Sequence, residues 1–187
     1  MIRLASALDK QDMIGFTRSF VTDLRKGREA VNGELLPWLD DLDTGWSGVL
    51  CLGMGGSAAG GDFLSVLCDE SGAIPVRCHR GYNLPNWWTP DWLILATSYS
   101  GNTEETLEAC NEALKNDATI VVISSGGELA GMCELSDSAY LISCPGGQPP
   151  RSAFGHIFSR QLALLVEIGI LQTEVSEHAL MRLQLAV

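Results

Sequence analysis

The sequence has little positive charge. Its 12 lysine and arginine residues stand against 23 aspartate and glutamate residues, which gives a formal net charge of -11 at pH 7. Because a nucleic-acid surface needs clustered basic side chains to neutralise phosphates, we expect no nucleic-acid partner. A small anion can still bind, since salt screens distant charges over about 8 Å and local donors decide such binding.

The sequence also has no C-x-x-C pair. Its six cysteines are scattered at positions 51, 68, 78, 110, 133 and 144, most of them among apolar residues. Such cysteines are expected to be buried free thiols in a reducing compartment. The neighbours Cys78 and His79 would point to opposite faces of a strand, so we expect no metal site.

Long apolar runs are missing as well. The longest one, LALLVEIGIL (162–171), has about half the length of a bilayer span and contains Glu167. The amino terminus meets charged residues too early for a secretory signal peptide. We therefore expect a cytoplasmic protein that has no membrane partner.

Short apolar runs, in contrast, are frequent. GVLCLG (48–53), DWLILATS (91–98) and ATIVVISS (118–125) are typical of strands buried on both faces, and IPVRCH and AYLISC are two weaker candidates. Helical stretches at 57–69 and 103–116 lie between them. This alternation predicts an α/β fold, a doubly wound five-stranded parallel sheet flanked by helices.

Helices are also expected on both sides of this alternating region. Apolar residues recur at helical spacing from Leu8 to Ala30, and the segments 151–169 and 174–186 are typical of a carboxyl-terminal helix pair. The stretch CPGGQPP separates that pair from the strands. We expect one domain over residues 1–150, and helices over 151–187 that lead into a second domain.

The stretch CLGMGGSAAGGD (51–62) is nearly bare of large side chains where a strand gives way to a helix. Glycines let the backbone approach a ligand closely, and the first N–H groups of a helix attract an anion. Ser57 is expected to cap this helix and to offer its hydroxyl. For this loop alone, a tight turn without a ligand is an equally good interpretation.

The same loop matches a G-x-G-x-x-A dinucleotide fingerprint through Gly53, Gly55 and Ala58. That fingerprint requires an acidic residue at the end of the next strand, where PVRCHRGYN has arginines and a histidine. A Walker Gly-Lys-Ser/Thr motif is also missing. A nucleotide ligand therefore ranks below a phosphate ligand of another kind.

A second polar loop, TSYSGNTEET (97–106), follows the strand DWLILATS. The hydroxyls of Ser98, Ser100 and Thr103 stand just ahead of a helix, and they could cradle a phosphate. We expect Ser98 and Ser100 to face solvent when the site is empty. A capping box of Asn102 and Glu105 would start the helix, with or without a ligand.

Five segments now point to one family: GMGGSAAGGD, RGYNLP, SYSGNTEETL, ISSGGELA and PPRSAFG. They occur in the same order in bifunctional phosphoglucose/phosphomannose isomerases, members of the sugar isomerase (SIS) domain superfamily, which the chain resembles from about residue 51 to 158. The resemblance implies a SIS domain over 1–150 that interconverts glucose or mannose 6-phosphate with fructose 6-phosphate through a cis-enediol. It implies no cofactor, and a homodimer or pairing with a second SIS domain.

The resemblance also implies the site residues, which are Gly56, Ser57, Ser98, Ser100, Thr103 and Arg151. Gly56 and Ser57 would contact the sugar phosphate, and the three hydroxyl residues would cradle the phosphate. Arg151, in PPRSAFG, would reach the sugar and stabilise the charge of the enediolate. The alternative for Arg151 is a solvated residue at the start of a helix.

Two features depart from the family pattern. His156 replaces a residue that is usually apolar, and we expect it to pack or to cap. The general base and the ring-opening histidine of the family lie in the second domain, and nothing recommends Glu167, Glu174, Glu177 or His178 for either role. The chain is therefore expected to be a fragment, half of a split enzyme, or a non-catalytic sugar-phosphate-binding or regulatory module.

Overall fold

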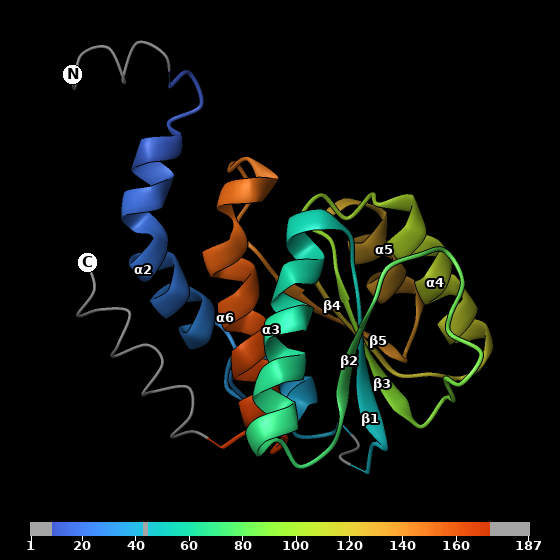
Figure 1. The fold of residues 1–187 in the computed structure, drawn as a ribbon. Helices are drawn as coiled ribbons and strands as arrows, with labels where there is room; N and C mark the ends of the chain where they lie inside the picture. Colours follow the sequence, from blue (N-terminus) through green and yellow to red (C-terminus); the bar gives the residue numbers. More distant parts are fainter. Residues whose placement is uncertain (1–8, 43–44, 173–187) are drawn as a thin grey trace.

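Five parallel strands form one sheet in the order β2-β1-β3-β4-β5. The structure is a computed structural model that describes residues 9–42 and 45–172. The predicted five-stranded parallel α/β sheet is confirmed (Figure 1). The strands are β1 (Gly48–Leu52), β2 (Val76–His79), β3 (Trp92–Thr97), β4 (Ile120–Ser124) and β5 (Ala139–Ser143).

Helices cover both faces of the sheet (Figure 1). They are α2 (Met13–Glu29), α3 (Gly55–Ser71), α4 (Glu104–Lys115), α5 (Gly127–Leu135) and α6 (Phe154–Glu167), with short 3-10 turns η1 (Pro37–Leu39) and η2 (Pro150–Ser152). Val49 and Leu93 point to one face and join the core that α3 and α6 complete. Leu50 and Ile94 point to the other face, toward α4 and α5. Successive residues of the central strands are thus buried on opposite faces, as their continuous apolar runs predict.

Helix α2 packs mainly on α6. The helix begins at Met13 rather than at Leu8, because Asp12 adopts a left-handed conformation (φ 51°). The Asp9 carboxylate accepts hydrogen bonds from the N–H groups of Met13 (2.7 Å) and Ile14 (2.8 Å). Leu8 itself lies outside the described residues.

Two local features differ from the sequence predictions, and one prediction is not tested. Helix α3 begins at Gly55 with Met54 as its N-cap, so the predicted cap at Ser57 is wrong. Helix α5 was not predicted, because its start lies in the glycine pair of ISSGGELA. The helix expected at 174–186, with Glu174, Glu177 and His178, lies outside the described residues.

The six cysteines are all free, and four of them are buried. Burial raises the pKa of the Cys68 and Cys78 thiols to about 11, so both stay protonated at neutral pH. Across residues 9–42 and 45–172 no group of three or more possible metal ligands occurs. None of the helices in these ranges is both long and apolar enough to cross a membrane.

Candidate functional site

The loops after β1 and β3 meet at the point where the direction of the sheet connections changes. Strand β2 lies on one side of β1, and β3 lies on the other side. The carboxyl end of β1 is therefore the switch point at which open parallel sheets bind ligands. A Cβ at Gly53 would lie 2.9 Å from the carbonyl oxygen of Thr97, the last residue of β3. Only glycine therefore allows the two loops to approach this closely.

The glycine loop opens directly into α3. Gly55 has a left-handed backbone (φ 52°), and a Cβ at Gly55 or Gly56 would meet no atom within 4 Å. The Ser57 N–H already donates to the Met54 carbonyl (3.1 Å), so the N–H groups of Gly55 and Gly56 precede the first bonded N–H of the helix. Both glycines are exposed and Ser57 is half-buried. This is the backbone arrangement that attracts an anion.

The serine loop brings the three predicted hydroxyls together. Ser98 Oγ lies 2.7 Å from Thr103 Oγ1 and 3.5 Å from Ser100 Oγ, and it accepts a hydrogen bond from the Gly101 N–H (3.1 Å). Ser100 is exposed and Thr103 half-buried, but Ser98 is only 1 % exposed. The expectation that Ser98 faces solvent is therefore wrong: its hydroxyl is the buried centre around which the loop is organised.

A third loop, after β4, braces the serine loop. Ser125 donates to the Tyr99 carbonyl through its N–H (3.1 Å) and its hydroxyl (2.6 Å), and the Leu129 N–H donates to the Gly101 carbonyl (3.0 Å). Gly101 and Gly127 both have φ of 72°, and a Cβ on Gly101 would lie 1.8 Å from the Gly126 carbonyl oxygen. ISSGGELA was used only as one of the family motifs, and its two glycines are the sequence signal for this tight contact between the loops.

Asn102 also belongs to this brace. Its side-chain carbonyl accepts a hydrogen bond from the Glu128 N–H (3.0 Å), in the first turn of α5. The N-cap of α4 is Thr103, and it makes no side-chain cap hydrogen bond. The predicted capping box of Asn102 and Glu105 is therefore wrong, because Asn102 caps a different helix.

The segment after β5 is tied to the serine loop through Tyr99. The Tyr99 hydroxyl donates to the Pro145 carbonyl (2.9 Å) and accepts from the Gln148 N–H (3.0 Å). These two hydrogen bonds fix the segment that leads to Arg151. The turn η2, which contains Arg151, lies at the same end of the molecule as the start of α3 (Figure 1). Arg151 itself is exposed and donates to the side-chain carbonyl of Gln11. The contacts described for Arg151 do not include the serine-loop hydroxyls.

Behind this segment lies a buried polar network. His156 is 4 % exposed, and its Nε2 lies 3.3 Å from the Asp23 carboxylate of α2, which also accepts hydrogen bonds from Ser19 (3.0 Å) and Gln148 (3.4 Å). Burial lowers the pKa of His156, while Asp23 acts in the opposite direction. His156 therefore packs, as one of the two expectations had it, and it joins α2 to α6.

Glu167 is placed far from these loops. It is exposed at the last residue of α6, whereas the segment with Arg151 precedes the first residue. At 1.5 Å per residue, this helix separates the two ends by about 20 Å. The structure therefore gives Glu167 no place at the site.

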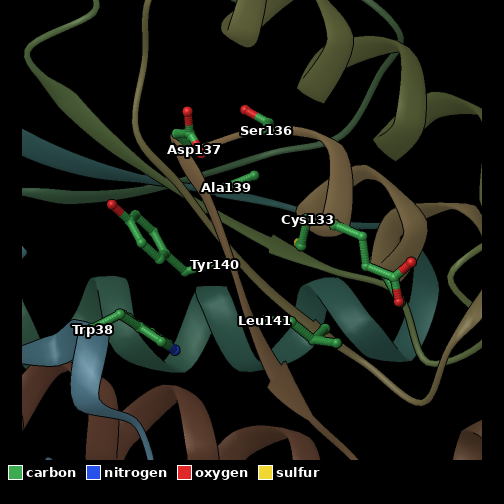
Figure 2. A pocket seen from close by; sticks show the side chains of 9 residues that line it. Trp38, Cys133, Ser136, Asp137, Ala139, Tyr140 and Leu141 are labelled. Atoms are coloured by element: carbon green, nitrogen blue, oxygen red, sulfur yellow. The ribbon is translucent and has the colours of Figure 1, made fainter.

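A separate hollow of about 440 Å³ runs along the outer edge of the sheet. Figure 2 shows its lining on strand β5 and helix α5, including Cys133 and Leu141. Trp38 of η1 stacks on Tyr140 there, with ring centroids 4.9 Å apart. This hollow contains none of the residues that the sequence predicts for the site.

Solved structures similar to this chain share its fold, and they include phosphosugar isomerases. Tagatose-6-phosphate ketose/aldose isomerase from Escherichia coli has a TM-score of 0.65 at 19 % identity, over 89 % of this chain and 50 % of that one. The carboxyl-terminal domain of glucosamine-fructose-6-phosphate aminotransferase from Francisella tularensis has a TM-score of 0.67 at 16 % identity, over 95 % and 54 %. At these identities the likeness shows the fold alone.

Sequence comparison is more specific. The chain is 41 % identical to the bifunctional phosphoglucose/phosphomannose isomerase of Caldicellulosiruptor bescii over 71 % of its length, and 39 % identical to that of Thermoplasma acidophilum over 60 %. It is also 36 % identical over 60 % of its length to a D-glucosamine-6-phosphate 4-epimerase of Sulfolobus acidocaldarius. No protein-family model matches. The resemblance indicated by the five motifs is confirmed, and the chain spans 38 % of the Caldicellulosiruptor bescii protein.

Proposed function

We propose that this chain is the sugar-phosphate-binding SIS domain of a phosphoglucose/phosphomannose isomerase. Such an enzyme interconverts glucose 6-phosphate or mannose 6-phosphate with fructose 6-phosphate. The observation that supports it most is the cluster of Ser98, Ser100 and Thr103 hydroxyls in the loop after β3, which lies beside the loop after β1 that holds the exposed glycines Gly55 and Gly56. Both groups lie at the switch point of the sheet, where a phosphate can accept hydrogen bonds from each side.

The proposed roles differ among the hydroxyls. Ser100 is exposed and Thr103 is half-buried, so these two can contact the phosphate directly. The buried Ser98 hydroxyl would position the other groups, because it is hydrogen-bonded to the Thr103 hydroxyl and to the Gly101 N–H. Gly56 and Ser57 would contact the ligand from α3. Arg151 would leave Gln11 and stabilise enediolate charge, and the general base would come from outside this chain.

Serine-to-alanine variants test the phosphate cradle. Ser100→Ala is expected to weaken fructose 6-phosphate binding by about 10- to 100-fold, because a hydrogen bond to a charged group contributes about 1.5–3 kcal/mol. The urea midpoint should not change, since Ser100 is exposed. Ser98→Ala is expected to lower stability as well, because Thr103 and the Gly101 N–H lose a buried partner. Titration calorimetry and urea unfolding measure the two effects.

Ser71→Ala is the matched control for these variants. Ser71 ends α3 at the far side from the glycine loop, and its exposed hydroxyl bonds only within its own helix, to Leu67. It should leave both affinity and stability unchanged. If Ser100→Ala binds fructose 6-phosphate as tightly as the wild type, the proposed cradle is wrong.

The domain boundaries and the partner belong to this proposal as well. Residues 1–150 would form the SIS domain, and 151–187 would lead toward a second SIS unit. The phenylalanine patch, which comprises Phe63, Val66, Phe154 and Phe158, is the surface that such a unit would cover. Phe63 and Val66 are 56 % and 60 % exposed, and the Phe63 ring lies 5.9 Å from Phe154 and 5.7 Å from Phe158. For the chain by itself, the expected occupant is a second copy.

Sedimentation tests this interface. The chain is expected to form a dimer, and serine at both Phe63 and Val66 should weaken it by at least about 10-fold, because each buried apolar side chain contributes about 1.5–3 kcal/mol. Leu135→Ser is the control, since Leu135 is 90 % exposed on α5 across the sheet. A monomeric wild type, or equal weakening by both changes, would contradict the interface.

A second candidate is a non-catalytic sugar-phosphate-binding or regulatory module. Four residues were considered for the general base, and Glu167 is the only one of them within the described residues. This candidate is favoured because Glu167 lies at the end of α6 that is remote from the site. Both candidates use the same phosphate cradle, so they differ only in whether proton transfer occurs.

A further inference from the structure

Two buried polar side chains lie beneath the site, within the largely apolar core that α3 and α6 complete. Thr97 is the last residue of β3, and on its face of the sheet it follows the apolar residues Leu93 and Leu95. Gln161 of α6 donates a hydrogen bond from Nε2 to the Thr97 hydroxyl (2.9 Å), and both residues are only 1 % exposed. The two side chains therefore form a buried polar pair that joins the end of β3 to α6.

Gln161 also packs against the helix that carries the glycine loop. A Cβ at Gly60 would lie 1.9 Å from Gln161 Oε1, so the amide fills the space that a larger residue at position 60 would need. Gly60 lies about one turn after Gly56 in α3, and Thr97 directly precedes Ser98. Helices α3 and α6 lie side by side on this face of the sheet (Figure 1). One side chain thus contacts both elements that present the proposed phosphate-binding loops.

Stability alone does not account for this polar pair. A hydrogen bond between neutral groups contributes little to stability once both have lost water, whereas a buried polar atom without a partner lowers it. Among the described residues, no group donates a hydrogen bond to Gln161 Oε1. A methionine at position 161 and a valine at position 97 would fill nearly the same space and leave no polar atom unpaired. The pair therefore has a cost in stability, which points to a role at the site above it.

We infer that Gln161 is a positioning residue, which sets the distance between the glycine loop and the serine loop. This inference rests on the proposed function, in which a phosphate accepts hydrogen bonds from both loops. Gln161 acts through Thr97 on one loop and through Gly60 on the other. Because hydrogen bonds weaken steeply when their length or angle changes, a phosphate held from two sides needs the loops at one fixed distance.

The double variant Thr97→Val with Gln161→Met tests this role, because it removes the polar pair and keeps the packing. Fructose 6-phosphate affinity is expected to fall by about 3- to 10-fold, the range for one neutral hydrogen bond. Inorganic phosphate affinity should fall by the same factor, since both ligands use the same cradle. The urea midpoint should stay the same or rise, because the unpaired Gln161 Oε1 is gone. Calorimetry and urea unfolding of the full chain measure the two effects.

Two further measurements separate positioning from a general loss of structure. In the ligand-free double variant the NMR signal of the Gly101 N–H should move, because this group donates to the Oγ of Ser98, the neighbour of Thr97. The signal of Gly131, inside α5, should stay in place. Ser159→Ala is the matched control, because the buried Ser159 hydroxyl donates to carbonyls of its own helix. It should leave both affinities unchanged.

These measurements also separate the possible failures. If the wild type binds neither inorganic phosphate nor fructose 6-phosphate, the proposed function is wrong and this inference falls with it. If the wild type binds them and the double variant binds them equally well, only the role of Gln161 is overturned. A fall in affinity that comes with a lower urea midpoint, or a Gly101 signal that does not move, also overturns it.

Discussion

The chain alone is expected to bind fructose 6-phosphate without exchanging the C1 protons of this sugar with solvent deuterium. The aldose–ketose reaction moves a proton between C1 and C2, so it needs a positioned base in addition to the phosphate cradle. General acid–base groups each contribute about 10²- to 10⁴-fold, and the loss of both a base and a ring-opening acid should place exchange below detection. Proton NMR in deuterium oxide measures the loss of the C1 signals directly.

Complementation distinguishes the two candidate functions. The carboxyl-terminal part of the Caldicellulosiruptor bescii relative, added as a separate polypeptide, should restore exchange if this chain is half of an isomerase. A regulatory module would stay inactive with it. Exchange by the chain alone would contradict the prediction, and it would direct attention to Glu104 and Glu105 in the first turn of α4.

Gly101→Ala is expected to have the largest effect on the structure of the site. Gly101 has φ of 72°, and an added Cβ would lie 1.8 Å from the Gly126 carbonyl oxygen, which belongs to the backbone and cannot rotate away. Backbone strain of this kind costs about 1–3 kcal/mol by itself, and separating the two loops adds to it. We expect a loss of at least about 3 kcal/mol in urea unfolding, together with the loss of phosphate binding.

Gly131→Ala is the control for this variant. Gly131 lies inside α5, and a Cβ there would meet no atom within 4 Å. Because alanine restricts the unfolded chain and favours a helix, this change should stabilise the protein by about 0.4–1 kcal/mol. If Gly101→Ala unfolds at the same urea midpoint as the wild type, the loops after β3 and β4 are not in the close contact described above.

The sheet could be predicted because its strands are short continuous apolar runs, and that pattern depends only on neighbouring residues. The cluster of Ser98, Ser100 and Thr103 could be predicted for the same reason, since all three lie within six positions. The confirmed resemblance added the order of the motifs. The role of each site residue stays a prediction.

The features that the sequence did not reveal depend on distant partners. Asn102 accepts a hydrogen bond from an N–H group 26 positions away in the sequence. Arg151 donates a hydrogen bond to a glutamine 140 positions away. Ser98 is buried, and the loop after β4 is bonded to its neighbours Tyr99 and Gly101. The glycine pair of that loop also concealed the start of α5 in the sequence. Local propensity predicts that Asn102 caps α4, the helix that directly follows it in the sequence. Its contact with α5 depends on the fold and cannot be read from neighbouring residues.

The order in which the ribosome makes these elements has a consequence for the nascent protein. Helix α2 packs mainly on α6, which is synthesised 125 positions after α2 ends. Protein synthesis proceeds at about 5–20 residues per second, so α6 begins to appear about 6 to 25 seconds after α2 is complete. The serine loop likewise lacks its brace until α5 has been made. During that interval Leu24, which is buried in the finished structure, lacks its packing partner on α6.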